Sequence, residues 1–141
     1  MTTRTATARY DGFGKTGRGQ VSTQSGVLDA TPYGFNTRFE DGKGTNPEEL
    51  IAAAHASCFT MALSFALAGA GFTEGTLDTR AAVKLDKDGD SFKVSRSDLE
   101  LTASVPGITP EQFEELASGA KAGCPISKLL NAEITLKHEL R

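Results

Sequence analysis

Two cysteines, Cys58 and Cys124, are the residues of this chain best suited to redox chemistry. Cys58 lies within residues 51–73, a segment with no charged residue, where burial would raise the thiol pKa and leave an isolated thiol inert. Cys124 precedes Pro125, and proline is typical of the first turn of a helix. A thiol at a helix N-terminus is favoured as the thiolate by the helix dipole. Local sequence therefore favours Cys124 as the more reactive thiol. The alternatives are a core residue for Cys58 and an unpartnered turn residue for Cys124.

A histidine, His55, lies one helical turn before Cys58, on the same helix face. A Cys–His pair is conceivable, and an imidazole that fills a buried helix contact explains the residue equally well. His138 is expected to be exposed. The two cysteines and two histidines of the chain show none of the close paired spacings of structural zinc sites. A zinc site is therefore not expected.

Composition limits the class of protein and its partners. The chain has 141 residues, of which 38% are hydrophobic and 23% charged, with a net charge of -3. These values are typical of a soluble protein with a single domain over residues 1–141, and they offer no basic surface for nucleic acid. The N-terminus has no apolar core of a secretory signal. We therefore expect a cytoplasmic protein, in which a permanent structural disulfide is unusual.

The uncharged segment 51–73 is long enough in principle to cross a bilayer. It is rich in Ala and contains several polar residues, and acidic Glu48, Glu49 and Glu74 flank it without a basic anchor. We therefore expect no membrane span, and a helix buried inside protein.

The elements that would position the thiols begin with an antiparallel meander over the first forty residues, with 35–39 as its last strand. Asn46, Pro47 and Glu49 then form a helix start, as cap, first-turn proline and closing residue of a capping box. The helix is expected to run from Pro47 to about Leu67. Because it is apolar around its whole circumference, it should be surrounded by protein on every side.

The rest of the chain predicts a hairpin, two further helices and a final strand. Alternating residues indicate a hairpin over 76–105 with its turn at 86–90, and helical spacing begins at Thr109. A short helix over 125–130 and a strand over 134–140 follow. The whole order is that of an α+β fold.

Two long segments resemble a known family. They are PYGFNTRFEDGKGTNPEELIAAAHASCF and KAGCPISKLLNAEITL, and they are similar to the osmotically inducible protein C (OsmC) branch of the family that also includes the organic hydroperoxide resistance proteins. The resemblance implies an intertwined homodimer with composite sites. It also implies a cysteine-based peroxidase that reduces organic hydroperoxides, and hydrogen peroxide more weakly, in oxidative or osmotic stress defence.

The resemblance assigns roles to four residues. Cys58 matches the peroxidatic cysteine of the family and Cys124 its resolving cysteine. Arg38 matches the arginine that supports the reactive thiolate, and Glu48 matches the glutamate that partners it, expected here as a bidentate pair. This assignment reverses the ranking of the two thiols that local sequence favours.

The implied reaction starts when the Cys58 thiolate attacks the outer peroxide oxygen, releasing an alcohol and leaving a sulfenic acid. Cys124 then forms a disulfide with Cys58, and an external dithiol, expected to be a lipoylated protein or dihydrolipoamide, reduces it. No metal, haem or flavin is required. Apolar residues that would favour an organic substrate are expected to include Phe35, Phe39, Phe59 and Met61.

Spacing places a limit on how these residues assemble. Glu48 and Cys58 are ten residues apart on one expected helix, which is about 15 Å along its axis. Either the helix breaks between them, or Glu48 reaches Cys58 from the second subunit of a homodimer. The alanine-rich sequence favours the dimer. Two other functions stay open: a binding protein that does not use its cysteines, and a redox sensor whose disulfide changes a partner surface without turnover.

Overall fold

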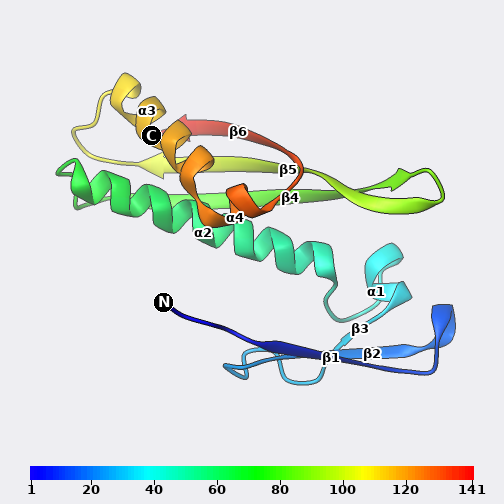
Figure 1. The fold of residues 1–141 in the computed structure, drawn as a ribbon. Helices are drawn as coiled ribbons and strands as arrows, with labels where there is room; N and C mark the ends of the chain where they lie inside the picture. The colour runs from blue at the N-terminus through cyan, green and yellow to red at the C-terminus, as the bar shows by residue number, and fades with distance from the viewer. The chain divides into compact units, whose positions relative to one another are not determined.

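The computed structural model describes residues 1–141, which form two compact units, residues 1–50 and residues 51–141. The first unit is blue to cyan in Figure 1, and the second is green to red. A single domain over residues 1–141 stays a prediction.

The first unit is an antiparallel sheet with a short helix after it. Its strands are β1 (Ala6–Asp11), β2 (Arg18–Thr23) and β3 (Thr31–Tyr33), in the order β1-β2-β3, which confirms the predicted meander. A single turn of 3-10 helix, η1 (Gly14–Thr16), joins β1 to β2, and helix α1 (Phe35–Phe39) follows β3.

The strand predicted over 35–39 is wrong, because these residues form α1. The amide of Gly34 donates to Thr37 Oγ1 at 2.8 Å, and the same hydroxyl donates to the Gly34 carbonyl at 3.0 Å. Asn46 Nδ2 donates to the Thr37 carbonyl at 2.9 Å. The rings of Phe35 and Phe39 pack with their centroids 5.0 Å apart, as residues four apart do on a helix. These contacts stabilise a helical turn where alternation alone suggested a strand.

Helix α2 (Pro47–Gly69) begins where the sequence predicts and runs without a break. Asn46 caps it, since its Oδ1 accepts from the amide of Glu49 at 2.8 Å. The Glu49 carboxylate accepts from the Thr45 hydroxyl at 2.7 Å, whereas the predicted capping box would have aimed it at the backbone of Asn46. The predicted end near Leu67 falls two residues short of the observed one.

The second unit contains a mixed sheet and two shorter helices. Strands β4 (Thr76–Asp88) and β5 (Ser91–Ser104) form the predicted antiparallel hairpin, and β6 (Glu133–Leu140) pairs with β5 in parallel. Helices α3 (Pro110–Gly123) and α4 (Pro125–Leu129) lie between β5 and β6 in the chain. The α+β fold, the hairpin, both helices and the final strand are confirmed.

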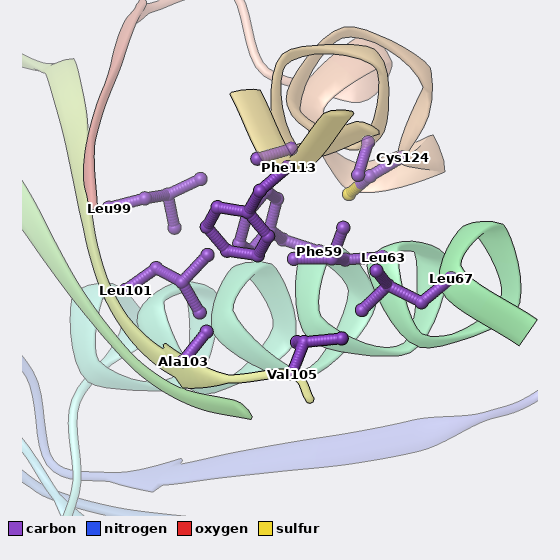
Figure 2. Packing of buried hydrophobic residues seen from close by; sticks show 11 residues of the cluster. Phe59, Leu63, Leu67, Leu99, Leu101, Ala103, Val105, Phe113 and Cys124 are labelled. Atoms are coloured by element: carbon purple, nitrogen blue, oxygen red, sulfur yellow. The ribbon is translucent and has the colours of Figure 1, made fainter. Parts of the chain in front are cut away.

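The apolar core of the second unit lies between α2, β5 and α3 (Figure 2). Phe59, Leu63 and Leu67 are spaced four residues apart on one face of α2 and are buried, as expected for a helix packed on one side. The other members are Leu99, Leu101, Ala103, Val105, Phe113, Ala117, Ala120 and Cys124. Cys124 is thus part of the core.

The expectation that protein surrounds α2 on every side is wrong for a single chain. Met61 and Phe65 are 62% and 72% exposed, because the sheet and α3 cover only the face that carries Phe59 and Leu63. By length and composition α2 is also apolar enough to cross a membrane, a test that the core helix of a soluble protein passes too. The fully buried Phe59 and Leu63 are typical of such a core helix.

Candidate active site

The structure brings the two cysteines together within the second unit. Cys58 comes from α2 and Cys124 from the junction of α3 and α4. Both are free thiols and they are neighbours, since Cys58 packs against the core cluster that contains Cys124 and each thiol shifts the pKa of the other. Cys124 is fully buried in the core drawn in Figure 2 and Cys58 is half-buried. From sequence, only the family resemblance pairs these residues, and the structure shows them as neighbours.

The two thiols differ in acidity. Burial raises the pKa of Cys58, and its hydrogen bond with Cys124 raises that pKa further. Burial by itself also raises the pKa of Cys124, but hydrogen bonds from Cys58, from Ser127 and from the amide of Ile126 outweigh it and lower the pKa. The donors at the start of α4 therefore favour a thiolate at Cys124. This agrees with the ranking from local sequence, and Cys58 needs a cation to become a thiolate.

Local geometry explains how Cys124 comes to accept hydrogen bonds. Its amide donates to the Ala120 carbonyl at 3.0 Å and ends α3. Pro125 then opens α4, as predicted, and Cys124 Sγ accepts from the Ser127 amide at 3.5 Å as the cap of that helix. The Cys124-Pro125 pair therefore fixes the sulfur between two helices.

Arg38 and Glu48 form an ion pair within the first unit. Arg38 Nε lies 2.6 Å from Glu48 Oε1, and the two side chains are 38% and 11% exposed. The predicted bidentate pair is thus a single contact. The guanidinium carbon lies 5.7 Å from the centroid of the Phe39 ring, and the group presents Nε alone to the carboxylate. Glu48 Oε2 is buried and has no hydrogen-bond partner within the chain.

The four predicted site residues therefore form two pairs. Cys58 and Cys124 are in contact in the second unit, and Arg38 and Glu48 are in contact in the first. Their catalytic roles stay predictions. No group of three or more His, Cys, Asp or Glu side chains is arranged to hold a metal ion.

His55 makes no hydrogen bond with Cys58 and is a buried helix contact, the second of the two alternatives. It is fully buried, with Nδ1 2.6 Å from Ser97 Oγ and Nε2 2.8 Å from Ser127 Oγ. Burial lowers its pKa, so the imidazole is neutral at pH 7. Neither serine stood out in the sequence. Ser127 had one usable signal, because it follows Cys124, which was placed at a helix N-terminus, by three residues, and a capping side chain bonds the backbone amide at that spacing.

The residues expected to line a hydrocarbon site have different environments. Phe59 is 0% exposed and belongs to the core, so it cannot line a site open to substrate. Phe39 and Met61 are 44% and 62% exposed, and Lys15 Nζ lies 4.7 Å from the Phe35 ring centroid. A substrate-binding role stays a prediction for Phe35, Phe39 and Met61.

Comparison with known proteins establishes the family. The family model described as OsmC-like protein matches residues 40–139. The chain is also 54% identical over 134 residues to a protein named peroxiredoxin OsmC from Escherichia coli strain K12, covering 95% of this chain and 94% of that protein. The chain belongs to the OsmC-like family. The resemblance that the two cysteine segments suggested is thereby confirmed.

Solved structures of the family share the fold. The crystal structure of the organic hydroperoxide resistance protein OhrB of Bacillus subtilis superposes with a TM-score of 0.73 at 30% identity, and 98% of each chain is covered. An organic hydroperoxide resistance protein from Elizabethkingia anophelis, solved with bound thiocyanate, gives a TM-score of 0.76 at 26% identity, covering 100% of this chain and 98% of that one.

Proposed function

We propose that this protein is a cysteine-based peroxidase that reduces organic hydroperoxides, and hydrogen peroxide more weakly, to alcohols in stress defence. Its 54% identity to a protein named peroxiredoxin OsmC, and its similarity to organic hydroperoxide resistance proteins, support this activity. The observation that carries the chemistry is the contact between the free thiols of Cys58 and Cys124. A sulfenic acid on one sulfur would find its disulfide partner already in place.

Cys58 is the sulfur that attacks the peroxide. It is half-buried, whereas Cys124 is fully buried, so a substrate reaches Cys58 first. The Cys58 thiolate bonds to the outer peroxide oxygen, the O–O bond breaks, and the alcohol leaves after taking up the proton that the thiol gave up. The product on the protein is Cys58 sulfenic acid.

Arg38 supplies the cation that Cys58 lacks within its own unit. The pKa of Cys58 is raised there by burial and by Cys124, and a guanidinium beside the sulfur would lower it. The same group would hydrogen-bond the peroxide and stabilise charge on the leaving oxygen. Glu48 positions the guanidinium through the contact with Nε.

The site is composite, and it is formed between two copies of this chain. Helix α2 is unbroken from Pro47 to Gly69, so Glu48 and Cys58 of one chain are separated by about 15 Å along its axis. In a homodimer, Glu48 and Arg38 of one chain serve Cys58 of the other. The buried Glu48 Oε2 without a partner supports a missing neighbour, as do the exposed Met61 and Phe65.

The disulfide between Cys58 and Cys124 is reduced by an external dithiol, for which a lipoylated protein or dihydrolipoamide is the candidate. The reaction requires no metal, haem or flavin, since both redox equivalents pass through sulfur. We place the protein in the cytoplasm, with neither nucleic acid nor a membrane as a partner.

The test is consumption of cumene hydroperoxide by the purified protein with dihydrolipoamide as reductant. We expect turnover in the unmodified protein, none in Cys58→Ser, and one oxidation per chain without recycling in Cys124→Ser. Full activity in both variants would contradict the mechanism. Formation of the disulfide without turnover in the unmodified protein would instead favour the redox sensor.

A further inference from the structure

A chain of hydrogen-bonded polar side chains runs through the core of the second unit and ends at Cys124. Ser97 on β5 contacts His55 Nδ1 at 2.6 Å, and His55 Nε2 contacts Ser127 Oγ at 2.8 Å. The Ser127 amide donates to Cys124 Sγ at 3.5 Å, and the Ser127 side chain lies beside the same sulfur, where it lowers the pKa of Cys124. Ser97, His55 and Cys124 are 0% exposed.

The donor and acceptor properties of these groups give the series of hydrogen bonds one direction. A thiolate only accepts hydrogen bonds, so when Cys124 is ionised the Ser127 hydroxyl must donate to it. Ser127 Oγ then accepts from Nε2–H of His55, and Nδ1, the acceptor of a neutral imidazole, accepts from the Ser97 hydroxyl. Every donor thus points toward the sulfur, an arrangement in which successive hydrogen bonds strengthen one another.

No charged side chain faces Cys124 or His55, so none stabilises the Cys124 thiolate in place of these hydrogen bonds. The groups that face Cys124 are Cys58 from α2, and Ser127 and the amide of Ile126 from α4. His55 faces Ser97 from β5 and Ser127 from α4, and burial alone shifts its pKa. A core that needed only packing would avoid a buried imidazole, because its desolvation is costly. His55 is in place to orient the Ser127 hydroxyl.

We propose that Ser127, oriented by His55 and Ser97, is a positioning residue that holds Cys124 as a thiolate aimed at the sulfenic sulfur of Cys58. The inference rests on the proposed function, in which Cys124 resolves the sulfenic acid. In that step the S–S bond forms and the S–O bond of Cys58 breaks. The departing hydroxide and the proton that Cys124 gave up make water, and His55 stays neutral.

The test separates the two half-reactions by rapid quench and intact-mass measurement over a pH series. Sulfenic acid adds one oxygen to the protein, and the disulfide removes two hydrogens from the reduced form. In Ser127→Ala we expect the first oxidation to proceed at the parental rate and disulfide formation to be about tenfold slower, since a hydrogen bond to a charged group is lost. The apparent pKa of disulfide formation should rise by about one unit.

Two variants serve as controls and one as an independent check. Ser118→Ala removes an exposed hydroxyl from the neighbouring helix α3 and should change neither half-reaction. Ser127→Thr keeps the hydroxyl and should keep the pH profile. His55→Phe should raise the same apparent pKa, and adding it to Ser127→Ala should shift that pKa no further, because His55 acts through Ser127.

The outcomes distinguish this inference from the proposed function. If Ser127→Ala forms the disulfide at the parental rate with the parental pH profile, Ser127 has no positioning role and the inference is overturned. If the unmodified protein forms sulfenic acid but never the disulfide, the resolving role of Cys124 is wrong, and the inference falls with it.

Discussion

The two units of this chain differ in what they bury. Every buried apolar side chain lies in the second unit, together with both cysteines and His55. The buried side chains of the first unit are the polar Thr37 and Thr45.

The same division separates the chemical groups. The second unit supplies sulfur, a neutral imidazole and hydroxyls, with no cation beside the thiols. The first unit supplies the guanidinium, which is 38% exposed, and its carboxylate partner, which is 11% exposed. The two thiols thus lie at a buried core, whereas the guanidinium proposed to activate Cys58 is held by a single ion pair. Variants in the two units should therefore fail in different ways.

The largest expected effect is on stability, in the second unit. Phe59→Ala removes a fully buried ring from the core, and we expect it to lower the free energy of unfolding by about 3–5 kcal/mol. Phe65→Ala, on the exposed face of the same helix, should change the stability of a single chain by less than about 0.5 kcal/mol. Urea unfolding of both variants, with dimerisation followed separately, measures the difference. Equal losses at low protein concentration would contradict the contrast between the two faces.

The next largest effect is on the rate at which Cys58 is oxidised, in a variant of the first unit. Arg38→Ala should leave the fold intact and slow the first oxidation of Cys58 by about a hundredfold or more, because one charged donor to the transition state is lost. The alkylation pH profile of Cys58, measured in a Cys124→Ser background, should move to higher pH. Arg18→Ala, at an exposed arginine of β2, is the matched control. An unchanged rate and profile in Arg38→Ala would remove Arg38 from the site.

The smallest effect tests a pH-dependent contact of the sheet. A hydrogen bond from Arg96 and then one from Thr135 hold the pKa of Asp98 below its usual range. A depressed carboxyl pKa contributes stability above the unfolded-state value, and that stability is lost as pH falls through the folded-state value. Asp98→Asn should therefore lower Tm at pH 7 by about 2–4 °C.

The control for this change is Asp90→Asn, in the exposed hairpin turn. The Tm difference between Asp98→Asn and the parent should close as the pH falls through the carboxyl range. A Tm difference that persisted unchanged in acid would mean that the charge of the Asp98 carboxylate contributes nothing to stability.

Much of the fold followed from local signals. Asn46 and Pro47 marked the start of α2, and alternating residues marked the hairpin, because caps and side-chain alternation act over a few residues. The short helix α1 was not predicted, because the same local signals are ambiguous there. Phe35 and Phe39 are four apart, a spacing that fits both a strand face and a helix face, and one of the contacts that stabilise the helical turn comes from the distant Asn46.

The site was less accessible from sequence than the fold. Arg38 carried no local signal, and only the family resemblance singled it out. The contacts of His55 with Ser97 and Ser127 join positions 42 and 72 residues away, so no spacing rule could have found them. The exposed face of α2 could not be predicted from sequence either, because a helix that is apolar on all sides does not reveal which side its own chain covers.

The most direct test of the account is to identify the sulfur that peroxide oxidises first. Cys124→Ser and Cys58→Ser are each treated with one equivalent of cumene hydroperoxide in the presence of dimedone, and the adduct is located by peptide mass mapping. We expect a rapid adduct on Cys58 in Cys124→Ser, and none on Cys124 over the same time in Cys58→Ser. An adduct on Cys124 that forms as fast as the one on Cys58 would show that acidity within the second unit, rather than access and Arg38, selects the attacking thiol.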